Sequence, residues 1–305
     1  MIRTTLSLLQ ALIIDMDGVL WRGSEPLPGI ADFFAFLRRR GIRFALATNN
    51  SSHTPAQYAG RLASHGAQVA AEEIVTSAVA TAEHLATLVP GGSRVYAIGM
   101  DGVRQALAKR GFVLSDGDGP APDRINRGLA LRSLPSPAVC GGPRPRAKQG
   151  GAGSEAEGIA AVVVGIDWRV TYEQLKRASL LIRAGAKFIG TNADATYPAP
   201  EGIIPGNGAL LAAIETATGV KPIVVGKPEP ILYRQALRRL NTPLEATAAL
   251  GDRLDTDILG GIRAGMKTIL VMSGVTTPEM LAASDCQPDW VFEDILDLIK
   301  HWDSE

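Results

Sequence analysis

Two carboxylates two residues apart, Asp15 and Asp17, follow the short apolar run 12–14. Such a run predicts a buried strand, and ionised carboxylates at its end are costly to bury unless a positive charge compensates them. A divalent cation would do so, because Mg²⁺ prefers hard oxygen ligands. Gly18 permits a tight turn whose backbone N–H groups can face an anion. Taken alone, the cluster could also be an ordinary capped loop.

Two further polar clusters follow apolar runs in the same way. Thr48, Asn49 and Asn50 come directly after one run, and their hydroxyl and amide groups can donate to phosphate oxygens or cap a helix. Lys227, in a Gly-Lys-Pro sequence, follows another run. It offers a compact positive charge at a strand end, with a surface lysine as the alternative.

A fourth cluster lies in the acidic segment 251–257. Asp252 would complete a metal site, and Asp257 lies one turn further along. The alternative is an acidic helix N-terminus, which the helix macrodipole favours in any case. Together, the four clusters contain the acids, donors and lysine needed to bind Mg²⁺ and a phosphate.

The elements that must position these clusters alternate along the whole chain. Apolar runs of strand type lie at 12–14, 44–47, 95–98, 161–164, 187–189, 223–225, 248–250 and 268–271. Helical patterns begin at 30 (ending at Gly41) and lie at 55–65, 101–110, 172–184, 207–217, 229–240 and 255–264. This alternation predicts an α/β fold with parallel sheets covered by helices. Ligands bind at the carboxyl ends of such strands, where the clusters lie.

Composition narrows the class of protein. The 305 residues include 31 basic and 31 acidic side chains, and 46% are hydrophobic. This is typical of a packed protein of one large or two smaller domains, and the balanced charge does not favour nucleic acid as a partner. Two cysteines, Cys140 and Cys286, cannot form a disulfide framework, so we expect a cytoplasmic protein. No signal peptide or membrane-spanning segment is expected.

One segment, 117–158, breaks the alternation. It is rich in glycine and proline, and between Arg124 and Lys148 it has six basic residues and no acidic one. We interpret it as a disordered or loosely attached insertion, with a basic docking segment as the alternative.

The order of the clusters resembles the four motifs of haloacid dehalogenase (HAD) superfamily phosphatases: DxDGVL, a strand-end Thr-Asn, Gly-Lys-Pro and GDxxxxD. The spacing is most similar to the NagD-like branch (subclass IIA), which includes 4-nitrophenyl, phosphoglycolate and pyridoxal phosphatases. Further matches lie at 190–194, 205–208, 256–258 and 264–265. The resemblance covers nearly the whole chain except 117–158.

The resemblance implies a Rossmann-like HAD core with a parallel sheet, made of residues 1–81 and 188–305. It also implies an inserted α/β cap domain of the C2 type at 82–187, which contains the Gly/Pro-rich segment. Such a cap closes over the site, excludes water and selects the leaving group. A homodimer formed through the cap is a further expectation.

The resemblance also assigns roles at the reacting end of the site. Asp15 would be the nucleophile that forms an aspartyl-phosphate, and Asp17 the general acid and then base. Mg²⁺ would be held by Asp15, the backbone carbonyl of Asp17 and Asp252, with Asp257 ordering these ligands or a coordinated water.

Other residues would bind the substrate. Thr48, Asn49, Asn50 and Lys227 would contact the phosphoryl oxygens. The loop 192–198 would run close to the site, which makes Asn192, Asp194 and Tyr197 candidates for specificity. Tyr197 occupies the position before proline where pyridoxal phosphatases carry a substrate-contacting histidine, so pyridoxal phosphate is not favoured. Plain packing is the alternative role for this aromatic ring.

The sequence therefore predicts a Mg²⁺-dependent phosphatase acting on a small phosphorylated metabolite. Sugar phosphates, phosphoglycolate, nucleotides and 4-nitrophenyl phosphate are the candidate substrates. The alternative is a non-catalytic, phosphate-binding regulatory protein on the same fold, for which the paired acids Asp15 and Asp17 would be unnecessary. A dinucleotide-binding enzyme lacks support, because no G-x-G-x-x-G follows a strand.

Overall fold

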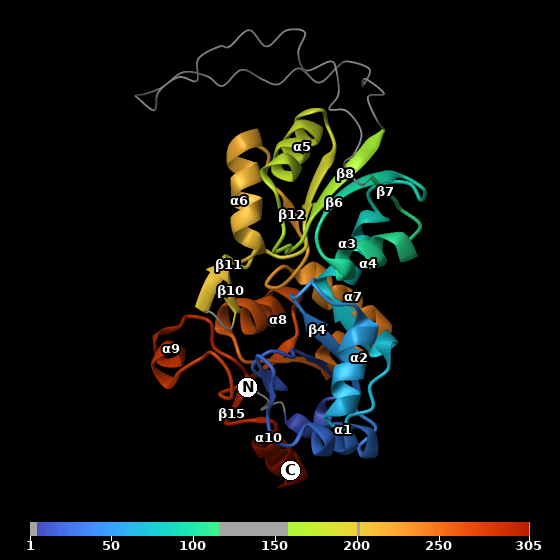
Figure 1. The fold of residues 1–305 in the computed structure, drawn as a ribbon. Coiled ribbons are helices and arrows are strands. Elements are labelled where there is room, and N and C mark those ends of the chain that lie inside the picture. The colour runs from blue at the N-terminus through green and yellow to red at the C-terminus, as the bar shows by residue number, and fades with distance from the viewer. Residues whose placement is uncertain (1–4, 116–157, 200–201, 305) are drawn as a thin grey trace, which may run out of the picture.

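The computed structural model describes residues 5–115, 158–199 and 202–304. It contains two parallel sheets, each with helices on both faces, stacked end to end (Figure 1). The α/β class predicted from the sequence is therefore confirmed. Residues 117–157 of the Gly/Pro-rich segment lie outside the described residues. Among the helices that are described, none is long and apolar enough to span a membrane.

The first sheet has six parallel strands in the order β15-β14-β13-β1-β4-β5. The strands are β1 (Ala11–Ile14), β4 (Arg43–Thr48), β5 (Ile74–Thr76), β13 (Thr247–Gly251), β14 (Lys267–Val271) and β15 (Trp290–Phe292). The central strand β1 is buried along its whole length. Strands buried on both faces read as continuous apolar runs, which is why the sequence reveals them.

The second sheet has five parallel strands in the order β12-β9-β8-β6-β7. These are β6 (Arg94–Ile98), β7 (Val113–Ser115), β8 (Ile159–Val164), β9 (Lys187–Gly190) and β12 (Ile223–Val224). Two short antiparallel pairs complete the strands: β2 (Trp21–Arg22) with β3 (Glu25–Pro26), and β10 (Thr196–Ala199) with β11 (Gly202–Pro205).

Helices cover both sheets. They are α1 (Ile30–Arg39), α2 (Pro55–Ser64), α3 (Ser77–Leu85), α4 (Asp101–Lys109), α5 (Tyr172–Arg183), α6 (Asn207–Thr218), α7 (Pro230–Leu240), α8 (Leu259–Ala264), α9 (Pro278–Ala283) and α10 (Ile295–Ser304). Residues of α1, α2 and α10 pack on one face of the first sheet. On its other face, a single apolar cluster runs through α7, α3 and α4 into the second sheet, so the two units share a core.

With one exception, the predicted helices and strands are present to within about two residues, and Gly41 (φ 68°) follows α1 as expected. The exception is the helix predicted at 255–264, where a π-helical turn, Leu254–Ile258, precedes α8. Three-residue strands such as β5 and β15, and helices α3, α9 and α10, were not predicted. A strand of three residues is too short to show a period.

The second sheet extends beyond residue 187, where the sequence analysis ended the inserted unit. β9 and β12 pair within this sheet, with Ile223 opposite Ile189, and α6 packs against α5. Residues that we assigned to the core thus form part of the second unit's sheet. The sequence does not reveal this, because a buried parallel strand reads alike in either sheet.

The carboxyl ends of the two sheets face each other. The loop after β4 touches both the start of α4 and the end of β9. The backbone N–H of Gly102 donates to the Ser52 carbonyl at 3.1 Å, and Thr191 Oγ1 donates to Ser51 Oγ at 3.2 Å. This junction holds the four polar clusters.

Candidate active site

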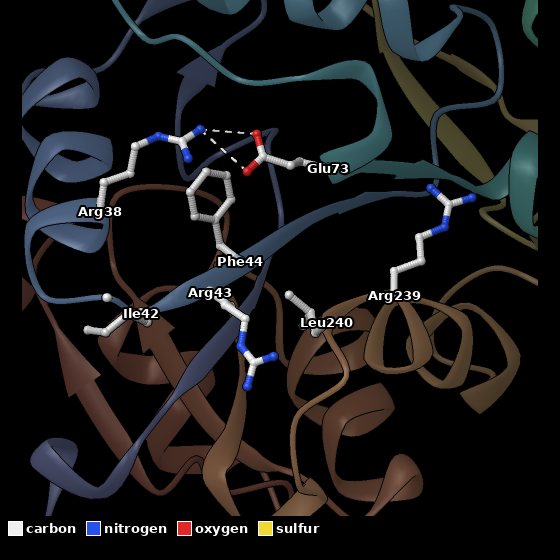
Figure 2. Close-up of a pocket in the computed structure, with 8 residues that line it drawn as sticks. Arg38, Ile42, Arg43, Phe44, Glu73, Arg239 and Leu240 are labelled. Atoms are coloured by element: carbon white, nitrogen blue, oxygen red, sulfur yellow. Dashed lines mark hydrogen bonds and ion pairs between the residues drawn. The ribbon is translucent and has the colours of Figure 1, made fainter.

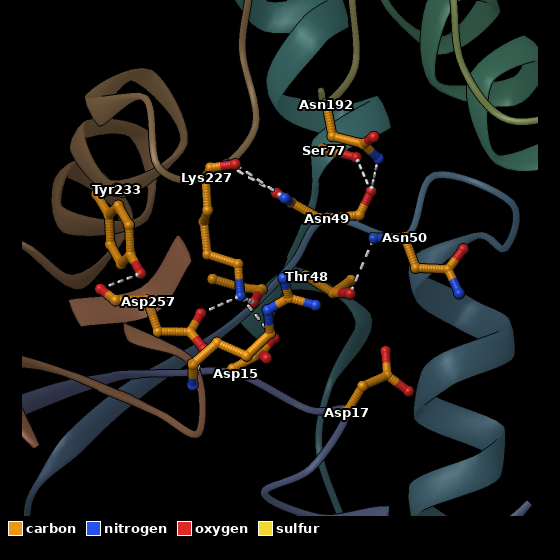
Figure 3. A network of polar contacts seen from close by, with 12 residues as sticks. Asp15, Asp17, Thr48, Asn49, Asn50, Ser77, Asn192, Lys227, Tyr233 and Asp257 are labelled. Carbon is orange, nitrogen blue, oxygen red and sulfur yellow. Dashed lines mark hydrogen bonds and ion pairs between the residues drawn. The ribbon is translucent and has the colours of Figure 1, made fainter. Parts of the chain in front are cut away.

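Asp15 and Asp17 lie in the turn that follows β1. The buried Asp15 continues the strand, and its N–H donates to the Leu250 carbonyl at 2.8 Å. Gly18 then adopts a φ of 84°, a left-handed conformation that glycine accommodates without strain. The turn projects the Asp17 side chain away from that of Asp15 (Figure 3).

Asp17 is held by an indole. Trp21 is fully buried, and its Nε1–H donates to Asp17 Oδ1 at 2.9 Å. Although the Asp17 side chain reaches solvent, desolvation by its neighbours raises its pKa, and the Trp21 hydrogen bond opposes the rise. A raised pKa favours the protonated carboxyl, which is the form a general acid requires.

Lys227 is the centre of the buried charges (Figure 3). Its Nζ lies 2.7 Å from Asp15 Oδ1 and 2.7 Å from Asp257 Oδ1, and donates to the Ala47 carbonyl at 3.2 Å. All three ammonium hydrogens therefore have partners. Burial opposes the charge of Lys227, but Asp15 and Asp257 outweigh it and raise its pKa, so the side chain stays cationic.

Asn49 ties three segments together. Its Oδ1 accepts from the Lys227 N–H at 2.7 Å, and its Nδ2 donates to the Lys227 carbonyl at 2.9 Å and to Asp194 Oδ1 at 3.1 Å. Its own carbonyl accepts from Asn192 Nδ2 at 2.5 Å and from Ser77 Oγ at 2.6 Å. The loop that we expected to approach the site is thus bonded to the end of β4.

Thr48 and Asn50 complete the end of β4. The Thr48 side chain is buried, and its Oγ1 accepts from the Asn50 N–H at 3.0 Å. Asn50 Oδ1 in turn accepts from the Ser52 N–H at 3.0 Å. These bonds form consecutive turns, which fix where the chain leaves β4 and hence where its donors lie.

Three carboxylates gather beside Lys227. Asp15, Asp252 and Asp257 are all buried, and each offers an oxygen within 4.8 Å of the others. Burial and the charge of Asp257 raise the pKa of Asp252 to about 7. Burial raises the pKa of Asp15 well above its ordinary value, with Lys227 opposing the rise and Asp257 adding to it. A single lysine thus leaves this cluster short of positive charge.

The cluster has the properties of a divalent-cation site. Asp252 Oδ2 accepts from the Val275 N–H at 2.7 Å, whereas its Oδ1 is buried without a hydrogen-bond partner. Burying such an oxygen is unfavourable unless it has a partner such as a cation. Gly18 and Gly274 leave the space that this carboxylate fills, since a Cβ on either would overlap it. An all-oxygen donor set of this kind suits Mg²⁺.

Asp257 differs from the other two carboxylates. Besides Lys227, it accepts from the Arg253 N–H at 3.1 Å through Oδ2. Its backbone carbonyl accepts from the buried Tyr233 hydroxyl at 3.0 Å. Both carboxylate oxygens therefore already have donors, which suits a residue that orients the site.

The structure thus brings every predicted site residue to one junction, including Tyr197, whose ring contacts that of Trp168. The sequence analysis missed Trp21, Ser77 and Gly274. Trp21 follows the first motif directly, but nothing in a sequence says that an indole four residues away turns back to a carboxylate. Gly274 lies 22 positions after Asp252 and carries no motif.

A pocket of about 440 Å³ lies at the amino ends of the strands of the first sheet, away from the carboxylates (Figure 2). It is lined by the amino end of β4 and the last residues of α1 and α7, including Arg38, Arg43 and Arg239. Arg38 is paired with Glu73 at 3.1 Å. Because the carboxylates lie at the carboxyl ends of the strands, this pocket plays no part in the site.

Comparisons with known proteins show the family to which the chain belongs. A family model described as haloacid dehalogenase-like hydrolase matches residues 12–113, and one described as HAD-hydrolase-like matches 224–298. An acid sugar phosphatase from Staphylococcus saprophyticus is 37% identical, over 95% of this chain and 97% of its own.

Two solved structures are similar over nearly the whole chain. A 4-nitrophenylphosphatase from Thermotoga maritima has 32% identity and a TM-score of 0.79, with 97% of this chain and 98% of that chain covered. A glycerol phosphate phosphatase from Mycobacterium tuberculosis, solved in complex with magnesium, has 28% identity and a TM-score of 0.77, with 97% and 78% covered.

Proposed function

The chain belongs to the haloacid dehalogenase-like hydrolase family, and on that premise we propose that it hydrolyses small phosphomonoesters through a phosphorylated Asp15. One observation carries this proposal. Asp15 is buried against Lys227 at 2.7 Å, beside two more carboxylates, while a second acid, Asp17, lies two residues away on a separate hydrogen bond. The regulatory alternative, a site that only binds phosphate, has no use for a second acid that is held apart from the carboxylate beside Lys227.

The first step transfers the phosphoryl group to the enzyme. A carboxylate oxygen of Asp15 attacks phosphorus, the bond from phosphorus to the ester oxygen breaks, and the electron pair leaves with that oxygen. Asp17 donates its proton to the departing oxygen, so that an alcohol is released. The desolvation that raises the pKa of Asp17 favours the protonated carboxyl from which this proton is donated.

The second step releases phosphate. Asp17, now ionised, accepts a proton from water as the water oxygen attacks phosphorus. The bond from phosphorus to Asp15 breaks and restores the Asp15 carboxylate. Asp17 is protonated again, so the cycle is balanced with no other reactant.

Mg²⁺ fits the donor set of this site. We assign its ligands to the carboxylates of Asp15 and Asp252 and the backbone carbonyl of Asp17, and the buried, unpartnered Asp252 Oδ1 supports this assignment. When bound, the cation would supply positive charge that offsets the clustered carboxylates and the charge of a phosphate. Asp257 would orient Lys227 and the turn at Arg253, because its oxygens already accept from both.

The substrate's phosphate would lie between Asp15 and the end of β4. Thr48 and Asn50 are donors that we assign to its oxygens, together with the Lys227 ammonium, which would exchange one of its present partners for a phosphate oxygen. Losing one donor should reduce the rate about 10²–10³-fold. Asn49, predicted as a phosphate donor, has its side-chain amide bonded to Lys227 and Asp194, which favours a role in holding these donors in place.

The named relatives point to small phosphorylated metabolites as substrates. Their names mention sugar, 4-nitrophenyl and glycerol phosphates. The scarcity of cysteine favours a reducing compartment, so we propose that the reaction takes place in the cytoplasm. The homodimer through the second unit stays a prediction.

The test is phosphate release from a panel of these esters with Mg²⁺, by the natural chain and by Asp15→Asn. We expect the variant to lose turnover while keeping the fold, judged by circular dichroism. Asp285→Asn, which changes an exposed carboxylate, is the matched control. Turnover by Asp15→Asn within tenfold of the natural chain would refute the nucleophile, and no turnover of any ester by the natural chain would refute the activity.

A further inference from the structure

An arginine of helix α2 lies against the indole that holds Asp17. The central guanidinium carbon of Arg61 is 3.9 Å from the centroid of the Trp21 ring, which is close enough for a cation–π interaction. The same guanidinium donates a hydrogen bond to the backbone carbonyl of Gly23, in the turn between β2 and β3. Arg61 therefore contacts both the Trp21 ring and the hairpin on which Trp21 lies.

A second side chain of α2 contacts the same indole. The Tyr58 ring lies parallel to that of Trp21, with the centroids 6.4 Å apart and 1° between the planes. Tyr58 and Arg61 are three positions apart on α2, so their side chains leave the same face of the helix. Because Trp21 is fully buried and has both a ring and a cation against it, its indole is held in one orientation.

That orientation matters because the indole N–H bonds one particular oxygen of Asp17. Trp21 Nε1–H donates to Asp17 Oδ1 at 2.9 Å, and the Trp21 carbonyl accepts from the Gly18 N–H of the same turn at 2.7 Å. A carboxyl oxygen that accepts an N–H hydrogen bond is the poorer site for the carboxyl's own proton. The proton of neutral Asp17 is therefore favoured on Oδ2, which is the oxygen left to protonate the departing ester oxygen.

We propose that Arg61 is a positioning residue for the general acid. It holds the Trp21 indole, and the indole in turn holds Asp17 with Oδ2 directed at the leaving group. This inference rests on the proposed phosphatase activity and adds a residue to its first step. If Arg61 only fastened the β2–β3 hairpin to α2, its loss would affect every ester alike.

Esters with different leaving groups separate these two roles. The 4-nitrophenolate ion leaves without a proton, whereas the alkoxide of glycerol phosphate needs one, so only the second ester depends on how Asp17 is held. The value of kcat/KM reports phosphoryl transfer to Asp15, because the leaving group has departed before water attacks. A slower second step would lower kcat for both esters and would leave their kcat/KM ratio unchanged.

The experiment measures kcat/KM for both esters in the natural chain and in variants of Arg61 and Trp21. Methionine keeps an unbranched side chain but removes the charge, so we expect Arg61→Met to lower kcat/KM for glycerol phosphate about tenfold and to leave 4-nitrophenyl phosphate within about twofold. Arg61→Lys, which keeps a cation, should recover most of this loss. Trp21→Phe keeps a buried ring but lacks the N–H, and should show the same selectivity with a larger loss.

Arg38→Met is the matched control. Arg38 also lies over an aromatic ring, 5.1 Å from the centroid of Phe44, but at the amino end of β4 and away from the carboxylates. The substitution therefore removes the same kind of contact from the same sheet. We expect it to change the ratio of the two kcat/KM values by less than about twofold.

A measurement without turnover follows the position of the indole itself. Exchange of the Trp21 indole N–H with solvent, read by NMR and assigned with Trp21→Phe, should be at least about tenfold faster in Arg61→Met. Circular dichroism would show that the variants keep the fold. An unchanged exchange rate, or equal losses on the two esters, would overturn the inference and leave the phosphatase activity standing. If the natural chain hydrolysed neither ester, the proposed function would fail, and this inference with it.

Discussion

Replacing Lys227 by methionine tests the charge arrangement at the centre of the site. Methionine keeps an unbranched side chain but removes the ammonium that lies 2.7 Å from both Asp15 and Asp257. The lysine is only 3% exposed, so water cannot take over its role. Two buried carboxylates and the Ala47 carbonyl would lose their shared donor.

The expected magnitude follows from that geometry. Removing one partner of a buried ion pair destabilises a protein by about 3–5 kcal/mol, because the remaining charge stays buried without compensation. We therefore expect Lys227→Met to lower the free energy of unfolding by about this amount in the presence of a chelator. In Mg²⁺ the difference should shrink, because the variant's carboxylates have lost their ammonium and should bind the cation more tightly than those of the natural chain do.

Urea denaturation followed by circular dichroism, with and without Mg²⁺, measures both quantities. Lys221→Met, which removes an exposed lysine six positions earlier, is the control and should change stability by less than about 0.5 kcal/mol. Turnover by Lys227→Met should fall at least about 10²-fold. A variant as stable as the control in chelator would show that Lys227 does not neutralise these carboxylates.

Three further perturbations test other parts of the site. Gly274→Ala should displace the Asp252 carboxylate that its Cβ would overlap, and so raise the Mg²⁺ concentration for half-maximal activity at least about tenfold. Gly91→Ala is the control, because a Cβ at Gly91 meets nothing, and it should leave this concentration unchanged. Equal Mg²⁺ dependence of the two variants would argue against the metal assignment. Asn49→Ala should lower the free energy of unfolding by about 2–4 kcal/mol in urea denaturation, because it leaves both the backbone N–H and the backbone carbonyl of Lys227 unpaired. A change below about 1 kcal/mol would show that these bonds are replaced. Chelation should abolish phosphate release and Mg²⁺ should restore it, while activity that persists in excess chelator would exclude a metal-dependent site.

Much of the site could be predicted because it lies at strand ends. Asp252 and Asp15 follow β13 and β1 directly, and Thr48 is the last residue of β4; these three strands are neighbours in the first sheet. Each strand shows as an apolar run, and the carboxyl ends of neighbouring parallel strands meet at one edge. The placement of these residues therefore follows from local pattern and the α/β class alone.

The partners of these side chains could not be predicted. Asn49 bonds Lys227 across 178 positions, and the sequence shows only that both carry polar groups after a strand. Such contacts depend on how loops pack in three dimensions. The same holds for Trp21, whose indole donates to Asp17 and not to Asp15.

The extent of the second unit was hidden for a related reason. β12 has only two residues, and α6 follows the β10–β11 pair directly. Hydrogen bonding, and not composition, assigns β9 and β12 to the second sheet. A sequence pattern identifies a parallel strand but does not say which sheet receives it.

The central claim, that Asp15 carries the phosphoryl group, can be tested by trapping it. Asp17→Asn should still be phosphorylated by 4-nitrophenyl phosphate, whose leaving group needs no proton, but should release phosphate slowly because no base activates water. Acid quenching and mass analysis of the peptides should then find one added phosphoryl group on the peptide bearing Asp15. The same experiment on Asp15→Asn should find none. A phosphoryl group on another residue, or none on Asp15 while turnover continues, would contradict this account.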